Sequence, residues 1–372
     1  MKRIVLSMAF HKETTLMPRN MTQKPSKGKV PRKTMTVRAI TVLALVFVVL
    51  LPAWLFPPHE PLSPTGPYAV ATERSTYVDK TRAEPFSISG EDRKVNAVFW
   101  YPQNADSAQT YPLVVFSHGA LGTENSNESL FLELASHGYV VVSIGHPYHA
   151  LWTEDEDGHI TFASMDYVQE LQREDAKTDK KQSYRYYQKW MEVRTSDIHF
   201  VMDTILKNAV SGADGVYVLI DVERMAVMGH SLGGSAALAM PRQRDDIDAV
   251  IALESPFLYD IVGVENNEFV WLDEAYPVPV LNVYSDASWS HLSEWTQYAR
   301  NDELLSSPQT KAINLHLSGA GHFSLTDLPL ASPLLVRWLE GGEGTRDSAE
   351  YLKDLNRACL EFFDRYLKRQ VE

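Results

Sequence analysis

Cysteine is nearly absent from this sequence of 372 residues, which contains only Cys359. A single cysteine excludes an intramolecular disulfide and a cysteine metal cluster, and its position near the C-terminus argues against a thiol nucleophile. Internal repeats are absent too. Basic residues are scarce beyond residue 38, because ten of the 35 Lys and Arg residues lie in residues 1–38, beside one acid, Glu13. The remaining chain is strongly acidic, which argues against nucleic acid as a partner.

One long apolar run stands out in the N-terminal part. Residues 39–56 carry no charge, and 18 mostly apolar residues suffice for a short membrane span. The basic residues Arg32, Lys33 and Arg38 precede the run, so the positive-inside rule keeps the tail, residues 1–38, in the cytoplasm. We therefore expect a single-pass signal-anchor with the rest of the chain outside the cytoplasm.

Two other interpretations of this segment stay open. A cleaved signal peptide would make the protein secreted, and Ala69-Val70-Ala71 offers a cleavage site, although it lies far beyond the apolar run. Translation could also start at Met21 or Met35. Residues 57–67 are rich in proline and predict an extended, stiff linker. We place the start of the soluble domain, 68–372, near Tyr68.

Apolar runs of strand length alternate with helical patterns along this domain. Such alternation predicts a mainly parallel sheet with helices on both faces. Residues 147–192 interrupt it with a polar segment containing scattered aromatic residues, which predicts a cap-like insertion over the substrate entrance, partly helical. The expected strands are 93–101, 113–116, 139–144, 224–228, 248–253, 278–284 and 312–317, with helices at 126–136 and 347–369.

The most informative motif of the sequence is Gly229-His230-Ser231-Leu232-Gly233. A buried strand precedes it and an Ala-rich helix follows it. Gly-x-Ser-x-Gly in this setting is the nucleophile elbow of the α/β-hydrolase fold, in which a tight turn projects the serine hydroxyl from the end of the sheet. The glycines leave room where a Cβ would clash. Ser231 is therefore the candidate nucleophile.

A serine hydroxyl needs a base, and in this fold the base is a histidine late in the chain. His322 follows the last predicted strand in Gly319-Ala320-Gly321-His322, which places an imidazole at the same edge of the sheet as Ser231. Two acids could orient it. Glu254 ends the strand after the Ser231 strand, and Asp286 ends the next one, so the residue pattern alone leaves both open.

The oxyanion hole needs two backbone N–H groups. Leu232, directly after the nucleophile, should supply one. The turn after the strand 113–116 should supply the other, and within Ser117–Gly122 we choose Ala120. His118 is expected to hold this turn rather than to act as a base. This mechanism requires no metal and no organic cofactor.

With these residues in place, the chain resembles the platelet-activating factor acetylhydrolase family, the secreted lipoprotein-associated phospholipase A2 type with its bacterial relatives. That family carries its acid in an Ala-Leu-Asp context after the strand that follows the nucleophile. Ala252-Leu253-Glu254 matches this place with Glu for Asp, so the resemblance ranks Glu254 above Asp286. The matching stretches are Thr65–Val70, Phe116–Gly119, Leu134–Tyr139, Gly229–Gly234, Ala252–Glu254 and His322-Phe323.

The resemblance implies a serine ester hydrolase that acts on short or truncated acyl chains of phospholipids, or on small carboxylic esters. Alternatives on the same fold are a lipase, a polyester hydrolase or a peptidase. A membrane-tethered binding protein without turnover is a further alternative, but it would not need Ser231, His322 and an acid together. Residues 147–192 match the family poorly, so substrate choice does not follow from the resemblance.

Overall fold

The computed structural model describes residues 51, 54–87, 89–103, 109–306, 311–341 and 347–368. The expected strands belong to one sheet of eight strands in the order β1-β2-β4-β3-β7-β8-β11-β12, parallel from β4 onward and antiparallel at β1 and β2. The strands are β1 Val70–Ala83, β2 Asp92–Pro102, β3 Tyr111–Ser117, β4 Val140–Ile144, β7 Ile220–His230, β8 Ala249–Leu253, β11 Val280–Tyr284 and β12 Ala312–His316.

Side chains of each central strand alternate between two buried layers. Leu113 and Val115 belong to one apolar cluster, and Val114 and Phe116 to the other. Successive residues of a strand point to opposite faces, so a continuous apolar run predicts a strand covered on both sides. All seven residues of β3 are buried, as this reasoning expects.

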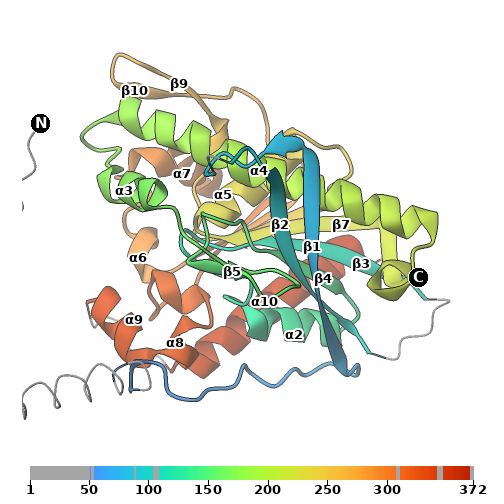
Figure 1. Cartoon of the computed structure of the whole chain (residues 1–372). Coiled ribbons are helices and arrows are strands. Elements are labelled where there is room, and N and C mark those ends of the chain that lie inside the picture. The colour runs from blue at the N-terminus through green and yellow to red at the C-terminus, as the bar shows by residue number, and fades with distance from the viewer. Residues whose placement is uncertain are drawn as a thin grey trace, which may run out of the picture. The chain divides into compact units, whose positions relative to one another are not determined.

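Helices cover the two faces of the sheet (Figure 1). On one face lie α2, Glu128–Ser136, and the closing helix α10, Ser348–Leu367, which contact each other. On the other face lie α4, Lys180–Ser211, and α5, Leu232–Ala239. The α10 helix begins at Asp347, whose side chain accepts hydrogen bonds from the backbone N–H groups of Ala349 and Glu350. An N-cap of this kind satisfies donors that have no partner within the helix.

The predicted insertion, 147–192, contains a short hairpin and the first part of a long helix. The hairpin is β5, Trp152–Glu154, with β6, Ile160–Phe162, and α3, Met165–Arg173, follows it. The α4 helix then continues to Ser211, across the boundary that we set at residue 192. Its buried residues, including Trp190, Ile198 and Ile205, join the main apolar cluster. The insertion therefore has no separate end, because one helix serves both the insertion and the layer on the sheet.

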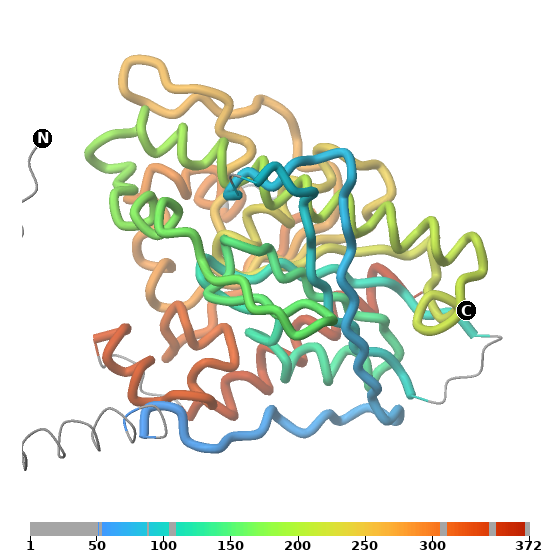
Figure 2. Tube along the Cα trace, in the orientation of Figure 1, coloured from blue at the N-terminus to red at the C-terminus, as the bar shows by residue number. Residues whose placement is uncertain are grey.

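Residues 62–66, part of the linker predicted over 57–67, are hydrogen-bonded to α2. The backbone N–H of Leu62 donates to Ser129 Oγ at 2.9 Å, and that of Thr65 donates to Glu133 Oε2 at 2.8 Å. Figure 2 shows this blue segment running beside the red and teal helices before it enters β1. The packed part of the chain therefore begins before Tyr68, because polar groups of this segment form hydrogen bonds with α2.

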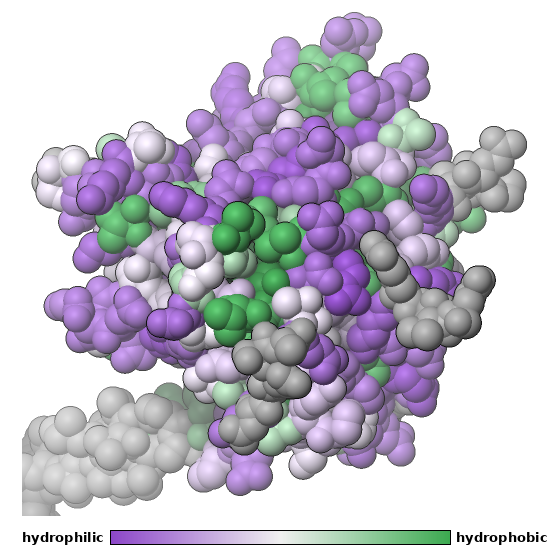
Figure 3. Space-filling model, turned by 90° about the vertical axis from the view of Figure 1, so that its right-hand side faces the viewer, coloured by the Kyte–Doolittle hydropathy of each residue, from purple (hydrophilic) through white to green (hydrophobic). Residues whose placement is uncertain are grey.

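The remaining elements are short. Besides 3-10 turns, they are the hairpin β9, Ile261–Glu265, with β10, Glu268–Trp271, and the helices α6, Asp286–Trp289, α7, Ala299–Ser306, α8, Leu328–Ala331, and α9, Pro333–Leu339. Figure 3 shows one side of the molecule, where the surface is mostly hydrophilic and apolar residues gather in small groups. Among the described residues, no helix combines the length and the apolar character needed to cross a bilayer. Most of the expected anchor, 39–56, lies outside the described residues, which include only 51 and 54–56 of it.

Candidate active site

Ser231 occupies the turn between β7 and α5. Its backbone has φ 52° and ψ −123°, and its N–H donates to the carbonyl of Leu253 on β8 at 2.8 Å. A positive φ at a residue other than glycine costs about 1–3 kcal/mol, and such strain gathers at functional sites. The side chain is half-buried. The strand, the strained serine and the helix are the arrangement that the sequence predicts for a nucleophile elbow.

Two glycines of the motif allow the elbow to close against its neighbours. A Cβ on Gly229 would lie 2.4 Å from the carbonyl carbon of Gly233, and one on Gly233 would lie 2.0 Å from the carbonyl oxygen of Ser117. Both obstacles are backbone atoms, which cannot rotate away. The glycines therefore let β7, α5 and the turn after β3 approach closely.

His322 begins a short 3-10 helix, η5, His322–Leu325, after β12. Its ring lies 4.6 Å, between centroids, from the ring of His230, the residue before Ser231. The ring of His230 also contacts the carbonyl of His322, at 3.1 Å from Nε2. These contacts bring His322 to the elbow, as the sequence predicts for the base. Desolvation of the ring lowers the pKa of His322, and the negative charge of Glu254 opposes that shift.

The two candidate acids have different surroundings. Glu254 is 2% exposed, and its Oε2 accepts a hydrogen bond from the Ser285 N–H at 2.7 Å. Its Oε1 has no hydrogen-bond partner among the described residues. Asp286, in contrast, is half-exposed and contacts His316 Nε2 at 2.7 Å through Oδ1, while Oδ2 accepts the Gly319 N–H at 2.8 Å. Glu254 thus has an oxygen left for an imidazole, whereas both oxygens of Asp286 are engaged.

The turn after β3, residues Ser117–Gly122, lies against the elbow. A Cβ placed on Gly119 would be 3.4 Å from the Cβ of Ser231 and 2.8 Å from His230 Nδ1. The N–H of Leu121 donates to the carbonyl of His149, and that of Gly122 donates to Gly119. The N–H of Ala120 has no such partner in the described part of the chain.

Within the part of the chain that the structure describes, two backbone N–H groups near the serine therefore lack a partner. Leu232 is the first residue of α5, and the N–H groups of a first helical turn have no acceptor within their helix. Ala120 supplies the other. Free N–H groups beside a nucleophile can bind the negative oxygen of a tetrahedral intermediate. The arrangement can support acyl transfer from an ester to a serine.

The comparison with protein families agrees with this chemistry. The family model "Platelet-activating factor acetylhydrolase, isoform II" matches residues 93–372. The chain belongs to this family. At the family level it is a serine hydrolase that acts on carboxylic esters.

Individual members and neighbours are distant from the chain. It is 26% identical over 266 residues to cutinase est2 of Thermobifida alba, with 70% of each chain covered. It is 24% identical over 284 residues to the platelet-activating factor acetylhydrolase of Gallus gallus, covering 70% of this chain and 63% of that protein, under two thirds of its length. A ferulic acid esterase from Streptomyces cinnamoneus shares the fold, with a TM-score of 0.63, 23% identity and coverage of 83% and 93% of the two chains.

The sequence pattern did not predict a buried group of charged residues that packs against the turn Ser117–Gly122. Arg194 on α4 is fully buried and donates from its guanidinium to the carbonyls of His118 and Gly119. Asp197, one turn further along α4, pairs with Arg93 of β2 at 2.6 Å. An arginine and an aspartate three residues apart on a polar stretch look like an exposed helical pair. Only the packing of α4 against β2 and β3 reveals that they are buried.

His118 holds the turn as expected. It is fully buried, and its ring nitrogens contact the carbonyls of Gly119 at 2.7 Å and Gly145 at 3.1 Å. Burial, with the nearby Arg194 and His146, lowers the pKa of His118 well below its usual range. The ring is therefore neutral and donates through only one nitrogen.

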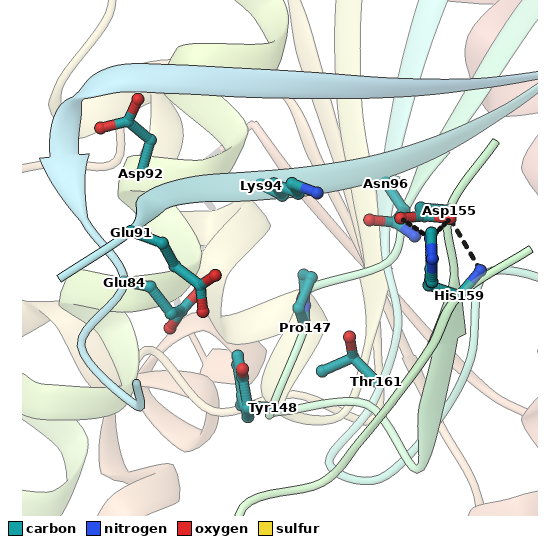
Figure 4. Close-up of a pocket in the computed structure, with 10 residues that line it drawn as sticks. All are labelled: Glu84, Glu91, Asp92, Lys94, Asn96, Pro147, Tyr148, Asp155, His159 and Thr161. Atoms are coloured by element: carbon teal, nitrogen blue, oxygen red, sulfur yellow. Dashed lines mark hydrogen bonds and ion pairs between the residues drawn. The ribbon is translucent and has the colours of Figure 1, made fainter. Parts of the chain in front are cut away.

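A hollow outside the elbow lies between β2 and the β5–β6 hairpin (Figure 4). Its lining includes Glu84, Glu91 and Asp155 but none of Ser231, His322 or Glu254. Asp155, Asp157 and His159 could offer ligand atoms to a cation within 4.8 Å of one another. However, Asp155 already accepts the backbone N–H groups of Asp157 and His159, as in an ordinary polar turn. This hollow is separate from the elbow.

Proposed function

We propose that the chain hydrolyses short-acyl or truncated phospholipid esters, or small carboxylic esters, with Ser231 as nucleophile, His322 as base and Glu254 as acid. The observation that carries the proposal is the strained turn at Ser231, held between a buried strand and a helix against the turn of Gly119. The contact of His322 with His230 and the open Oε1 of Glu254 support the other two roles.

In the acylation step, His322 takes the proton of the Ser231 hydroxyl as its Oγ bonds to the ester carbonyl carbon. The carbonyl oxygen becomes negative and is bound by the N–H groups of Leu232 and Ala120. The intermediate then collapses, the bond to the alkoxy oxygen breaks, and His322 gives its proton to the leaving alcohol. Glu254 stabilises the imidazolium while it exists.

In the deacylation step, water replaces the alcohol. His322 takes a proton from the water as its oxygen attacks the acyl carbon, and returns the proton to Ser231 Oγ as the carboxylic acid leaves. Both steps need an imidazole that is neutral at rest. The lowered pKa of His322 provides this state around neutral pH.

The experiment that tests this proposal is hydrolysis of chromogenic esters by residues 54–372, from acetyl to long acyl chains, by wild type and Ser231→Ala. We expect activity confined to short chains and its loss in the variant, with an unchanged melting temperature. Substantial activity in folded Ser231→Ala would reject Ser231 as the nucleophile.

A second candidate substrate class follows from the relatives named cutinases, such as that of Thermobifida alba. If the chain acts on this class, as a lipase or a polyester hydrolase would, it should turn over long-chain or polymeric esters. The same panel separates the two, since a preference for long chains or release of monomers from a polyester film would favour this second class.

We also infer from the sequence that residues 39–56 tether the protein to a membrane, with the catalytic domain outside the cytoplasm. The support is the uncharged apolar run after a tail with ten basic residues. Carbonate extraction of membranes from expressing cells tests it. Retention of the full chain in the pellet, with the catalytic domain accessible to protease only from outside, is expected; release of the full chain by carbonate would reject the tether.

A further inference from the structure

The buried guanidinium of Arg194 binds the backbone of the turn that would form half of the oxyanion hole. Nη1 donates to the carbonyl of His118 and lies 3.3 Å from Ser117 Oγ, and Nη2 donates to the carbonyl of Gly119 at 3.2 Å. Among the described residues no carboxylate forms an ion pair with Arg194. Burying a charge is expensive unless its donors are paired; here Nη1 and Nη2 are paired, whereas Nε has no partner among the described residues. Here the charge is directed at successive peptide carbonyls beside the nucleophile.

A chain of buried polar groups runs from Ser117, which Arg194 contacts, through His146 to Asp197. Ser117 Oγ lies 2.9 Å from His146 Nε2, and His146 Nδ1 lies 3.0 Å from Asp197 Oδ2. Asp197 also forms ion pairs with Arg93 and Arg82. Burial, despite Asp197, lowers the pKa of His146 to about 4, so its ring is neutral. Its Nδ1–H can then donate to the carboxylate, and its Nε2 can accept a hydrogen bond from the Ser117 hydroxyl.

The peptide between Gly119 and Ala120 links Arg194 to the catalytic site. A peptide unit is planar and trans, so its C=O and N–H point in opposite directions. Fixing the Gly119 carbonyl therefore fixes the direction of the Ala120 N–H. The carbonyl accepts hydrogen bonds from the Gly122 N–H and from Arg194 Nη2, and it lies 2.7 Å from His118 Nδ1. Of these three groups, only Arg194 carries a full charge, which also polarises the peptide and strengthens its N–H as a donor.

We propose that Arg194 is a positioning residue for ester hydrolysis, which holds the Gly119–Ala120 peptide with its N–H directed at the developing oxyanion. The inference rests on the proposed function of Ser231 and adds a role for α4. The long helix α4, which begins within the insertion, then contributes to the chemistry through the backbone of a different segment, without touching the substrate.

The test compares Arg194→Met and Arg194→Lys with a matched control, Arg242→Met. The Arg242 side chain is 6% exposed and bonds to Asp260 and to the carbonyls of Glu274 and Ala275, outside the candidate site. Each variant is measured for melting temperature, for kcat and KM per titrated active site with a short-acyl ester, and for affinity for a trifluoromethyl ketone. The ketone forms an oxyanion adduct with the serine and so reports on the oxyanion hole.

Loss of an oxyanion-hole donor typically lowers kcat by about 10²–10³-fold. We expect Arg194→Met to lower kcat by ~10–100-fold, because the N–H is misdirected rather than removed, with KM changed by less than about threefold. Affinity for the ketone should fall in parallel with kcat/KM. Arg194→Lys should recover part of both, since one ammonium can reach a carbonyl but cannot span two. Arg242→Met should have a lower melting temperature than wild type but unchanged kcat and affinity for the ketone.

Equal ketone affinity and kcat in Arg194→Met and wild type would overturn the inference, as would matching losses in Arg242→Met. If Arg194→Met does not fold, Arg194→Lys decides: unchanged ketone affinity and kcat in that variant would likewise reject the positioning role. These failures differ from failure of the proposed function, in which Ser231→Ala would keep its activity.

Discussion

Replacing Glu254 by Gln isolates the charge of the proposed triad acid with little change in shape. The carboxamide oxygen of the variant can still accept the Ser285 N–H that Glu254 Oε2 accepts at 2.7 Å. What the substitution removes is a negative charge beside His322 when the imidazole becomes cationic. A unit charge about 4 Å away is worth ~4 kcal/mol at an effective dielectric of about 20. At about 1.36 kcal/mol per tenfold, kcat should fall by about 10³-fold.

The pH dependence of kcat/KM provides a second, independent test of the same variant. The charge of Glu254 raises the pKa of His322 against the lowering effect of desolvation. Glu254→Gln removes the raising effect, so the pKa of His322 should fall further. The acidic limb of kcat/KM, where the base becomes protonated, should therefore move to lower pH.

The assay is initial-rate hydrolysis of a chromogenic acetyl ester from pH 5 to 9, normalised by active-site titration. Asp286→Asn is the matched control, because Asp286 is half-exposed and pairs with His316, and such pairs contribute about 0–1 kcal/mol. We expect less than a threefold change in its kcat. A near-normal kcat in Glu254→Gln, or a large loss in Asp286→Asn, would refute the assignment of the acid.

Three further predictions concern the fold around the site. Gly233→Ala should abolish soluble, folded protein or lower the free energy of unfolding by ~3 kcal/mol or more, because its Cβ would lie 2.0 Å from the Ser117 carbonyl oxygen; thermal melting checks this, and a wild-type melting temperature would contradict it. Burial raises the pKa of Asp327 to about 7, so the folded state binds a proton that the unfolded state releases near pH 4, and this residue lowers stability as pH rises from about 4 to about 7. Asp327→Asn should therefore be more favourable relative to wild type at pH 8 than at pH 4 in urea unfolding, and an equal difference at both values would reject the shift. Burial raises the pKa of the Cys359 thiol to about 12, so native protein should not react with a thiol reagent at pH 8 until it unfolds; fast stoichiometric reaction would show that the thiol is accessible.

The sequence predicts the central sheet and the elbow because both depend on local patterns. Continuous apolar runs mark strands covered on both faces, and Gly-x-Ser-x-Gly marks the turn at Ser231. His322 is found because it follows the last strand, and parallel strands end at one edge. The edge strand β1, Val70–Ala83, was missed, since it is largely polar and half-buried and its pairing with β2 is long-range.

Other elements escaped prediction for different physical reasons. The β9–β10 hairpin carries Asn266-Asn267 at its turn, both with positive φ, a signal that could have been recognised. The residue pattern alone leaves Glu254 and Asp286 open, and only the family resemblance ranks Glu254 first. The burial and hydrogen-bond partners in which the two residues differ depend on packing, which no local pattern reveals. The proposed role of Arg194 could not be predicted from the sequence, since it depends on contacts with residues 75 and 76 positions earlier.

The most direct test of the account is intact and peptide mass spectrometry after treatment with a serine-reactive fluorophosphonate. Wild-type protein should gain one adduct, located on Ser231, with loss of ester hydrolysis in proportion to labelling. Folded Ser231→Ala should gain none. An adduct on another residue, or no adduct on folded wild-type protein, would contradict the claim that Ser231 is the activated nucleophile.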